Sequence, residues 1–327
     1  MSIARPPLIC LMGPTAAGKT DLAIELAEAR GCELVSVDSA LVYRGLDIGS
    51  AKPSYPHHLV DVRDPLEIYS AADFAMDANR LAAEIASRGR TPLFVGGSML
   101  YFKAFLEGLS EVPASVPEIR GEIEAEAEMH GWPQLHAQLA EVDPVAAARI
   151  HPNHSRRIGR ALEVYRSSGT TLTQWQAQTS TLPLPTEHYR VIQMAICPGD
   201  RTALHKRINL RLKKMMAEGL LDEVRTLFER KELHRDLPAI RAVGYYQLWR
   251  HLEGEYSLAE AVERAESATR QMAKRQLTWL RKWPDLNWIL TDDQGNLTKA
   301  IESEDSAGLI GEKPIHWALS YLDNVPV

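Results

Sequence analysis

The chain has 327 residues, of which 45% are hydrophobic and 24% are charged, and its formal net charge at pH 7 is −6. These values are typical of a globular protein and exclude a fibrous or largely disordered chain. No segment approaches the roughly 18 apolar residues of a membrane-spanning helix, and the first ten residues lack a signal-peptide core, so we expect a cytoplasmic protein without a membrane partner. The three cysteines are widely spaced, which argues against disulfides and a structural zinc site.

The first predicted elements enclose a phosphate-binding loop. The apolar run Leu8–Met12 predicts a strand, and residues 21–30 have the pattern of an amphipathic helix. The segment between them follows the pattern G-x-x-x-x-G-K-T, in which inward-pointing amides and the helix N-terminus hold phosphate. Lys19 would neutralise phosphate oxygens, and the Thr20 hydroxyl would ligate Mg²⁺. The predicted loop consists of Gly13, Pro14, Thr15, Ala16, Ala17, Gly18, Lys19 and Thr20.

Two further apolar runs, Leu34–Val37 and Pro92–Val95, predict the next strands of a parallel sheet. The fold class expected is α/β, with a P-loop NTPase-like core in which helices flank the sheet. The second strand is followed by Asp38 and the third by Gly96-Gly97-Ser98. Because open parallel sheets bind ligands at their carboxyl edge, one cleft should hold all three loops.

A helical domain is predicted to interrupt this core. The proline-containing stretch Val112–Pro117 indicates the exit from the core. We predict a helical insertion domain over residues 113–187, within a core formed by residues 1–112 and 188–327. Its predicted features are helix N-caps at Asp143 and Asn153, a helix from Ser155 to about Ser167, a return loop over Thr179–Glu187, and then a core strand over Tyr189–Ile196.

Long helices are predicted over Thr202–Ala217, Leu221–Arg230 and Leu258–Lys282. Residues 201–282 carry 18 Lys and Arg against 11 Asp and Glu, whereas residues 285–327 carry 8 acidic and 2 basic residues. A basic segment followed by an acidic end fits an anionic macromolecular substrate, and a solvated helical surface would give the same count. The pair His57-His58 lacks further metal-ligand residues and is predicted to lie in a solvated loop.

Asp38 is the carboxylate of greatest chemical interest because it directly follows a predicted strand. From its position alone it has two interpretations. It could bind Mg²⁺ or cap a turn, or it could accept a proton from a nucleophile aligned against a phosphorylated substrate.

Several long motifs together resemble the tRNA dimethylallyltransferase family, also called the tRNA isopentenyltransferases. The resemblance extends from about Leu8 to Trp283. It implies transfer of a dimethylallyl group from dimethylallyl diphosphate to N6 of the adenosine 3′-adjacent to the anticodon, with release of diphosphate and assistance from Mg²⁺. The motifs are GPTAAGKT, DSALVYRGLDIGSAKP, GGSMLYFKAFLEGL, RAVGYYQLW and KRQLTWLRKW.

The resemblance implies roles for individual residues. Asp38 would be the base for the adenine amine, Ser98 would hold the adenosine, and Arg211 would stabilise the leaving diphosphate. Arg207 lies one helical turn before Arg211, so both side chains could face one cleft. Serines stand at positions 50 and 98, where the family usually has threonine, and we expect function to survive because the hydroxyl is retained.

The resemblance also implies a monomer without an obligate protein partner, contact with the tRNA anticodon stem-loop, and a tRNA-binding role for the insertion domain over residues 113–187. The target base would be extruded, and Tyr245, Tyr246 and Trp279 offer faces for stacking, although a role in the core is the commoner one for each aromatic. The implied tRNA-binding residues are Asp38, Ser39, Ala40, Leu41, Ser98, Arg120, Arg156, Arg157, Ile158, Gly159, Arg160, Arg241, Ala242, Val243, Gly244, Tyr245, Tyr246, Lys274, Arg275, Gln276, Leu277, Thr278, Trp279, Leu280 and Arg281.

Three other functions share some of these features. A small-molecule kinase would share the fold, Lys19 and Thr20 but would use ATP as donor. An adenylate isopentenyltransferase would use the same donor with a free nucleotide as acceptor. A nucleotide-binding regulator would have no turnover for an Asp38→Asn substitution to abolish.

Overall fold

The structure is a computed structural model that describes residues 5–110, 112–178, 183–300 and 309–324. The chain divides into two compact units. We call residues 1–106 with 184–327 the core unit, and Glu107–Pro183 the insertion unit. No helix in the described part of the chain is long and apolar enough to cross a membrane.

A seven-stranded sheet forms the centre of the core unit, in the order β3-β2-β4-β1-β5-β6-β7. All neighbouring strands are parallel except β6 and β7, which are antiparallel. Because β1 lies between β4 and β5, and β4 beside β2, the loops after β1, β2 and β4 are neighbours at the carboxyl edge, as the sequence predicts. The strands are β1 (Pro7–Met12), β2 (Cys32–Val37), β3 (His57–His58), β4 (Thr91–Gly96), β5 (Arg190–Pro198), β6 (Asn287–Thr291) and β7 (Leu297–Ala300).

Alternating residues of the strands pack against helices on two faces of the sheet. Leu8, Cys10 and Met12 belong to a large core shared with helices α2, α3 and α10 to α13. Ile9 and Leu11 belong to a second core shared with α1 and α14. Both faces of the parallel strands are therefore buried, which explains their largely apolar sequences.

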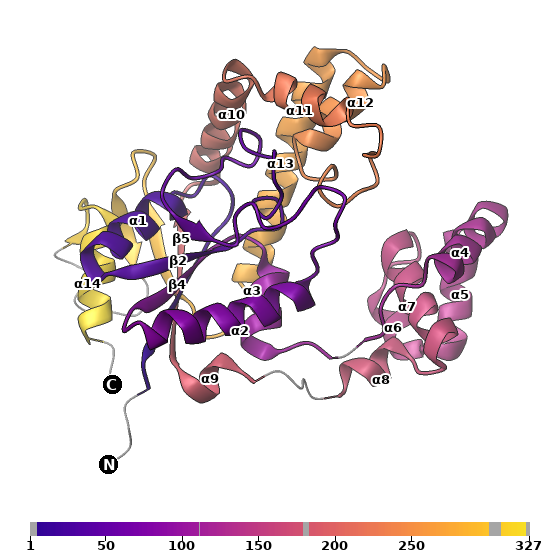
Figure 1. Ribbon diagram of the computed structural model, residues 1–327, viewed down its shortest axis with the longest axis horizontal. Coiled ribbons are helices and arrows are strands. Elements are labelled where there is room, and N and C mark those ends of the chain that lie inside the picture. Colours follow the sequence, from indigo (N-terminus) through magenta and orange to yellow (C-terminus); the bar gives the residue numbers. More distant parts are fainter. Residues whose placement is uncertain (1–4, 111, 179–182, 301–308, 325–327) are drawn as a thin grey trace. The chain divides into compact units, whose positions relative to one another are not determined.

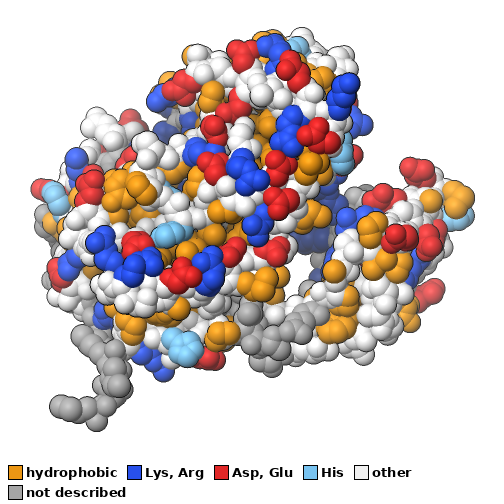
Figure 2. All heavy atoms as spheres, viewed as in Figure 1, with side chains coloured by type: hydrophobic (Ala, Val, Ile, Leu, Met, Phe, Trp, Pro, Cys, Tyr) orange, Lys and Arg blue, Asp and Glu red, His pale blue; other side chains and the backbone are white. Residues whose placement is uncertain are grey.

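The helices of the core unit follow the sheet in two groups. α1 packs beside α14, whereas α10 to α13 contact one another in a helical group (Figure 1). On the face drawn in Figure 2, side chains of both charge signs are interspersed over this group. The helices are α1 (Lys19–Arg30), α2 (Ala71–Ser87), α3 (Met99–Glu107), α9 (Pro185–His188), α10 (Arg201–Ala217), α11 (Leu220–Phe228), α12 (Tyr245–Leu252), α13 (Leu258–Leu280) and α14 (Pro314–Asn324).

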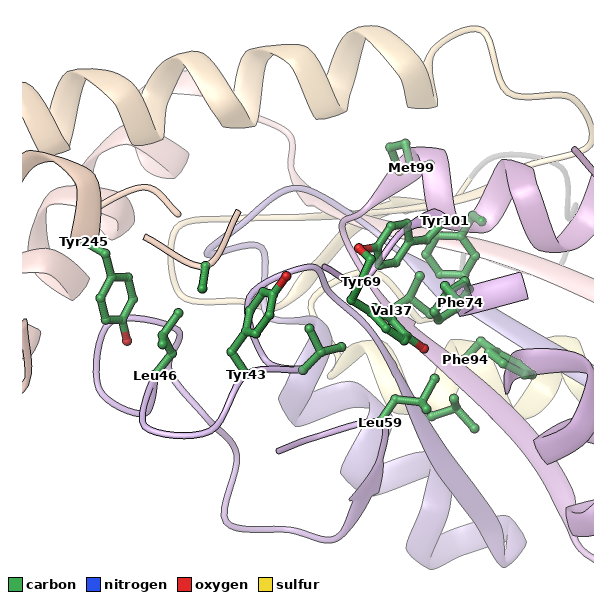
Figure 3. Packing of buried hydrophobic residues seen from close by; sticks show 14 of the residues in the cluster. Val37, Tyr43, Leu46, Leu59, Tyr69, Phe74, Phe94, Met99, Tyr101 and Tyr245 are labelled. Carbon is green, nitrogen blue, oxygen red and sulfur yellow. The ribbon is translucent and has the colours of Figure 1, made fainter. Parts of the chain in front are cut away.

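Aromatic side chains fix α2 and α3 against the sheet. The rings of Phe74 and Tyr101 are stacked, with centroids 4.8 Å apart and planes at 17° (Figure 3). The Tyr101 hydroxyl donates to the backbone oxygen of Tyr69 at 3.0 Å, so its polar end is satisfied within the core. This packing holds the start of α3, and therefore Ser98 just before it, in place.

The insertion unit contains helices α4 to α8 around its own apolar core. Asp143 caps α6 as predicted, because its carboxylate accepts from the Ala146 amide at 3.0 Å. The predicted cap at Asn153 is wrong: α7 begins after His154, and no side chain caps it by a hydrogen bond. The helices are α4 (Pro117–His130), α5 (Trp132–Val142), α6 (Pro144–Arg149), α7 (Ser155–Ser168) and α8 (Leu172–Gln176).

Other local predictions differ from the structure. His57 and His58 form the short edge strand β3 instead of a solvated loop, and the His58 ring lies 3.0 Å from the Glu33 carboxylate. The predicted return loop Thr179–Glu187 begins with four residues that lie outside the described residues, and its later part contains α9. The antiparallel hairpin of β6 and β7 was not predicted.

Candidate active site

The phosphate loop joins β1 to α1 with a conformation that requires its second glycine. Gly18 has φ of +93°, which favours glycine because side chains are strained there, and it immediately precedes Lys19 at the first position of α1. The Lys19 ammonium donates to the backbone oxygen of Pro14 at 2.7 Å. Burial and then the charge of the nearby Arg211 lower the pKa of Lys19, Asp38 opposes both effects, and the resulting pKa is about 8.

Arg211 lies in α10 and is the other cation close to Lys19. It donates to the backbone oxygen of Ser50 at 3.4 Å. Burial lowers the pKa of Arg211, while the charge of Asp38 acts in the opposite direction. Lys19, Arg211 and Asp38 therefore lie within electrostatic reach of one another, as two half-buried cations and one carboxylate.

A cavity of about 1180 Å³ extends from the phosphate loop. Lys19, Thr20, Arg207 and Arg211 all line it. Arg207 donates to the backbone oxygens of Asp292 and Asp293, at 3.0 and 3.1 Å, so its guanidinium is held by the loop after β6. Among the described residues, the one hydrogen bond of the Arg211 side chain is the longer 3.4 Å contact with the Ser50 oxygen, which leaves Arg211 the better-placed cation for an anionic ligand.

A smaller cavity of about 60 Å³ adjoins the first. Both cavities are lined by Ala16, Arg211 and Met215. Most of the other residues that line the smaller cavity are apolar, and they come from α10, α11, α13 and the segment before α12. These include Ile208, Leu212, Leu220, Val243 and Met272.

Asp38 and Ser98 lie at the ends of β2 and β4. Asp38 Oδ1 accepts from the amides of Ala40 and Leu41, at 2.8 and 3.3 Å, so the carboxylate does cap a turn. Its other oxygen, Oδ2, has no hydrogen bond to any described residue. Ser98 Oγ accepts from the Ser39 amide at 3.1 Å, which ties the two loops together. Asp38 and Ser98 do not line either cavity described above.

Gln276 connects two of these loops from the distant helix α13. Its Oε1 accepts from the Thr15 amide at 3.0 Å, and its Nε2 donates to the Gly97 oxygen at 2.9 Å. The sequence analysis places Gln276 in a tRNA-contacting segment, and its bridging position was not predicted. The contacts join residues 261 and 179 positions apart, so no local pattern signals them.

Glu223 in α11 is a second residue that sequence analysis missed. Its Oε2 accepts from the amides of Asp47 and Ile48, at 3.0 and 2.7 Å, and its Oε1 accepts from the Gly49 amide at 3.1 Å. The hydroxyl of Tyr245 also donates to Oε1. Glu223 thus fixes the loop that lines the phosphate-loop cavity and presents the Ser50 oxygen to Arg211.

The predicted tRNA-binding residues of the insertion unit differ in their availability. Arg156 and Arg157 are exposed on α7. Arg160 donates to the buried carboxylate of Glu163 at 3.0 Å, and Arg120 lies 3.5 Å from the same carboxylate. Ile158 is buried in the core of the unit, so its side chain supports α7 and does not face a ligand.

The predicted tRNA-binding residues of the core unit also differ in their availability. Lys274, Arg275 and Arg281 are exposed along α13, and Trp279 is 39% exposed, so its ring is available for stacking. Tyr245 is only 1% exposed, and Leu280 is fully buried. Tyr245 therefore has the core role named above as the commoner one for an aromatic residue: its ring fills the core, and its hydroxyl donates to Glu223.

Two family models match the sequence. The model described as IPP transferase matches residues 41–283, which is more than half of the chain. The chain belongs to the IPP transferase family. The model described as Isopentenyl transferase matches residues 6–63, the part that contains the phosphate loop and Asp38. The resemblance stated from the motifs is thereby confirmed.

Solved structures of this IPP transferase's relatives agree with its fold. A tRNA isopentenylpyrophosphate transferase from Bacillus halodurans is 37% identical over 88% of this chain and 90% of its own, with a TM-score of 0.63. A tRNA delta(2)-isopentenylpyrophosphate transferase from Staphylococcus epidermidis is 29% identical over 98% of this chain and 99% of its own, with a TM-score of 0.64. A eukaryotic dimethylallyltransferase acting on tRNA shares the fold at 22% identity and a TM-score of 0.74, over 98% of this chain and 81% of its own.

Proposed function

We propose that this chain, a tRNA dimethylallyltransferase, moves a dimethylallyl group from dimethylallyl diphosphate to N6 of the adenosine 3′-adjacent to the anticodon. The observation that carries the proposal is the grouping of Lys19, Arg211 and Asp38 at the carboxyl edge of the sheet. Two cations suit a diphosphate leaving group, and one carboxylate suits an amine that must lose a proton. The cytoplasmic location expected from the sequence is part of the same proposal.

The donor's diphosphate is proposed to lie on the phosphate loop. The loop amides, Lys19 and Arg211 would stabilise the charge that develops as the bond from the allylic carbon to the diphosphate oxygen breaks. The adjoining apolar cavity would take the dimethylallyl group, since Ile208, Leu212 and Val243 line it. This arrangement would place the reactive carbon between the cations and the acceptor.

Mg²⁺ is part of the proposal, with Thr20 as its protein ligand. Thr20 is exposed at the start of α1 and lines the phosphate-loop cavity. Mg²⁺ is commonly held by one or two protein groups together with substrate phosphates, which a single hydroxyl fits. When bound, the ion would add positive charge beside the leaving diphosphate.

The acceptor step is proposed to depend on Asp38. As the N6–carbon bond forms and the carbon–oxygen bond to diphosphate breaks, the amine proton would pass to the carboxylate. Oδ1 is occupied by two amides that fix the carboxylate's direction, and Oδ2 is left to accept the proton. Ser98 can donate its hydroxyl hydrogen to the adenosine while its oxygen keeps the Ser39 amide.

The RNA is proposed to contact the exposed cations Arg156 and Arg157 of the insertion unit and Lys274, Arg275 and Arg281 of α13. Phosphate contacts of this kind are sequence-independent and sensitive to salt. Arg120 and Arg160 support the insertion unit through Glu163, so we assign them a weaker role in binding.

The deciding experiment supplies Mg²⁺, radiolabelled dimethylallyl diphosphate and an unmodified tRNA, with AMP as alternative acceptor and ATP as alternative donor. Label should enter the tRNA. Asp38→Asn should reduce turnover by about 10² to 10⁴-fold while the affinity for tRNA and donor is kept. Label in AMP alone would indicate a free-nucleotide enzyme, and phosphate transfer from ATP would indicate a kinase.

A further inference from the structure

A third cavity, of about 430 Å³, lies in the core unit and shares no lining residue with the phosphate-loop cavity. The end of β5, the first turns of α10, one face of α13 and strand β6 enclose it. Its volume falls within the roughly 300–1,000 Å³ common for small-molecule sites. The proposed transfer reaction uses none of this space.

The described side chains that line this cavity include several cations and no carboxylate. Arg201, His205, Arg270, Lys274 and Arg281 line it, and no Asp or Glu is among its described lining residues. By contrast, the phosphate-loop cavity is lined by acidic as well as basic residues. The charge of this third cavity therefore suits an anionic ligand.

Several of these cations have few partners. Within the described residues, no ion pair or hydrogen bond engages the side chains of Lys274 and Arg281. Arg201 lies 3.5 Å from His205. Arg270 donates to Asn209 at 3.0 Å and to the Glu266 carboxylate at 3.5 Å, so its charge is partly compensated. Burial, followed by the charges of Arg201 and Arg270, lowers the pKa of His205. These positive groups therefore crowd together, a cost that a bound phosphate would offset.

The rest of the cavity is apolar and includes an aromatic ring. Trp288, a residue of β6, packs with Leu204 and Leu277 in a small core beneath the cavity. Trp288 and Leu277 also line the cavity. A ring system can stack or pack against such a surface while its phosphate contacts the cations. The combination matches a nucleoside phosphate better than it matches an inorganic anion.

We propose that this cavity binds a nucleoside phosphate unit other than the adenosine that receives the dimethylallyl group. The inference rests on the proposed function in one respect: it makes a second nucleotide of the substrate tRNA the expected source of that unit. Lys274, Thr278 and Arg281 line the cavity from α13, the helix already proposed to contact RNA. A free mononucleotide is the other source with the same chemistry.

The test uses Arg201→Gln, because Arg201 lies outside the segments assigned to RNA binding and is exposed, so the variant should fold. Lys213→Gln is the matched control: Lys213 is exposed on the same helix and lines none of the described cavities. One probe is a fluorescein-labelled anticodon stem-loop RNA, titrated at several salt concentrations. The other is 8-azido-AMP, photolysed and mapped to peptides by mass spectrometry.

Arg201→Gln should weaken RNA binding about tenfold and reduce the salt slope by about one, while Lys213→Gln stays within about twofold of wild type. If RNA affinity is unchanged but photolabel on residues 201–205 or 270–281 is lost, the cavity takes a free mononucleotide. If neither probe responds to Arg201→Gln or to Lys274→Gln, the cavity is not a nucleotide site. Neither measurement requires turnover, so a failed transfer assay on wild-type protein would refute the proposed function separately.

Discussion

Glu223→Gln should loosen the loop at residues 47–49 and weaken diphosphate binding, although Glu223 itself is not proposed to contact the ligand. The Glu223 carboxylate accepts three consecutive backbone amides and the Tyr245 hydroxyl. A glutamine retains one oxygen, so its NH₂ group must face either the Asp47 and Ile48 amides or the Gly49 amide and the hydroxyl. In both orientations, two hydrogen bonds to a charged acceptor are lost, and donor faces donor.

Hydrogen bonds to charged groups contribute about 1.5–3 kcal/mol each, and partial exposure of Glu223 favours the low end. We therefore expect the free energy of unfolding to fall by roughly 3 kcal/mol, which corresponds to a melting temperature lower by about 6–12 °C. Differential scanning fluorimetry measures the shift, and calorimetric titration with diphosphate should show weaker binding because Ser50 no longer positions Arg211. Glu229→Gln, an exposed control at the opposite end of the same helix, should change neither. A Glu223→Gln protein that melts within 1 °C of wild type would show that the carboxylate is not holding the loop.

Three further predictions concern charge and packing. Diphosphate affinity should fall as the pH rises through about 8, where the free Lys19 loses its proton, and calorimetry should find no such fall in Lys19→Arg. Gly96→Ala should lower the free energy of unfolding, measured in urea, by about 3 kcal/mol, because the added Cβ would lie 2.0 Å from the Val37 oxygen. The control Gly121→Ala should not destabilise the protein, because no atom lies within 4 Å of its added Cβ. Burial alone would raise the pKa of Glu163, but its hydrogen bonds hold that pKa below the usual range. The insertion unit should therefore lose stability as the pH falls below about 4.3. Glu163→Gln should lower the free energy of unfolding by about 3 kcal/mol at neutral pH, and tryptophan fluorescence measures both effects.

The parallel core was predictable because its strands are buried on both faces. β1 and β4 appear in the sequence as apolar runs, and β2 as a largely apolar one, each followed by a glycine or a polar residue at the ligand-binding edge. β6 begins with Asn287 and ends with Thr291, both buried, so its apolar run is only three residues long. Asn287 is satisfied by the Gln193 oxygen at 3.1 Å, a contact that only the folded sheet supplies.

Some residues of the candidate site were likewise predictable from the sequence, and others were not. The phosphate loop is contiguous, so its residue pattern alone predicts its position, and the motif resemblance nominates Asp38 and Arg211. Glu223 and Gln276 bind backbone groups of loops that lie 174 or more residues away in the sequence. Such contacts depend on which helices meet which loops, and this information is spread over the whole chain. The burial of Tyr245 has the same origin, because α12 directs one face of its ring into the core.

The position of β5 has a consequence for synthesis on the ribosome. β1 pairs with β4 on one side, but its other partner, β5, begins at Arg190, after the insertion unit has been made. At elongation rates of about 5–20 residues per second, one edge of the central strand would stay open for roughly 5–20 s after β4 emerges. An unpaired apolar edge invites pairing with another chain. The nascent protein should therefore need most protection during this interval, while the insertion unit, which has its own core, can already fold.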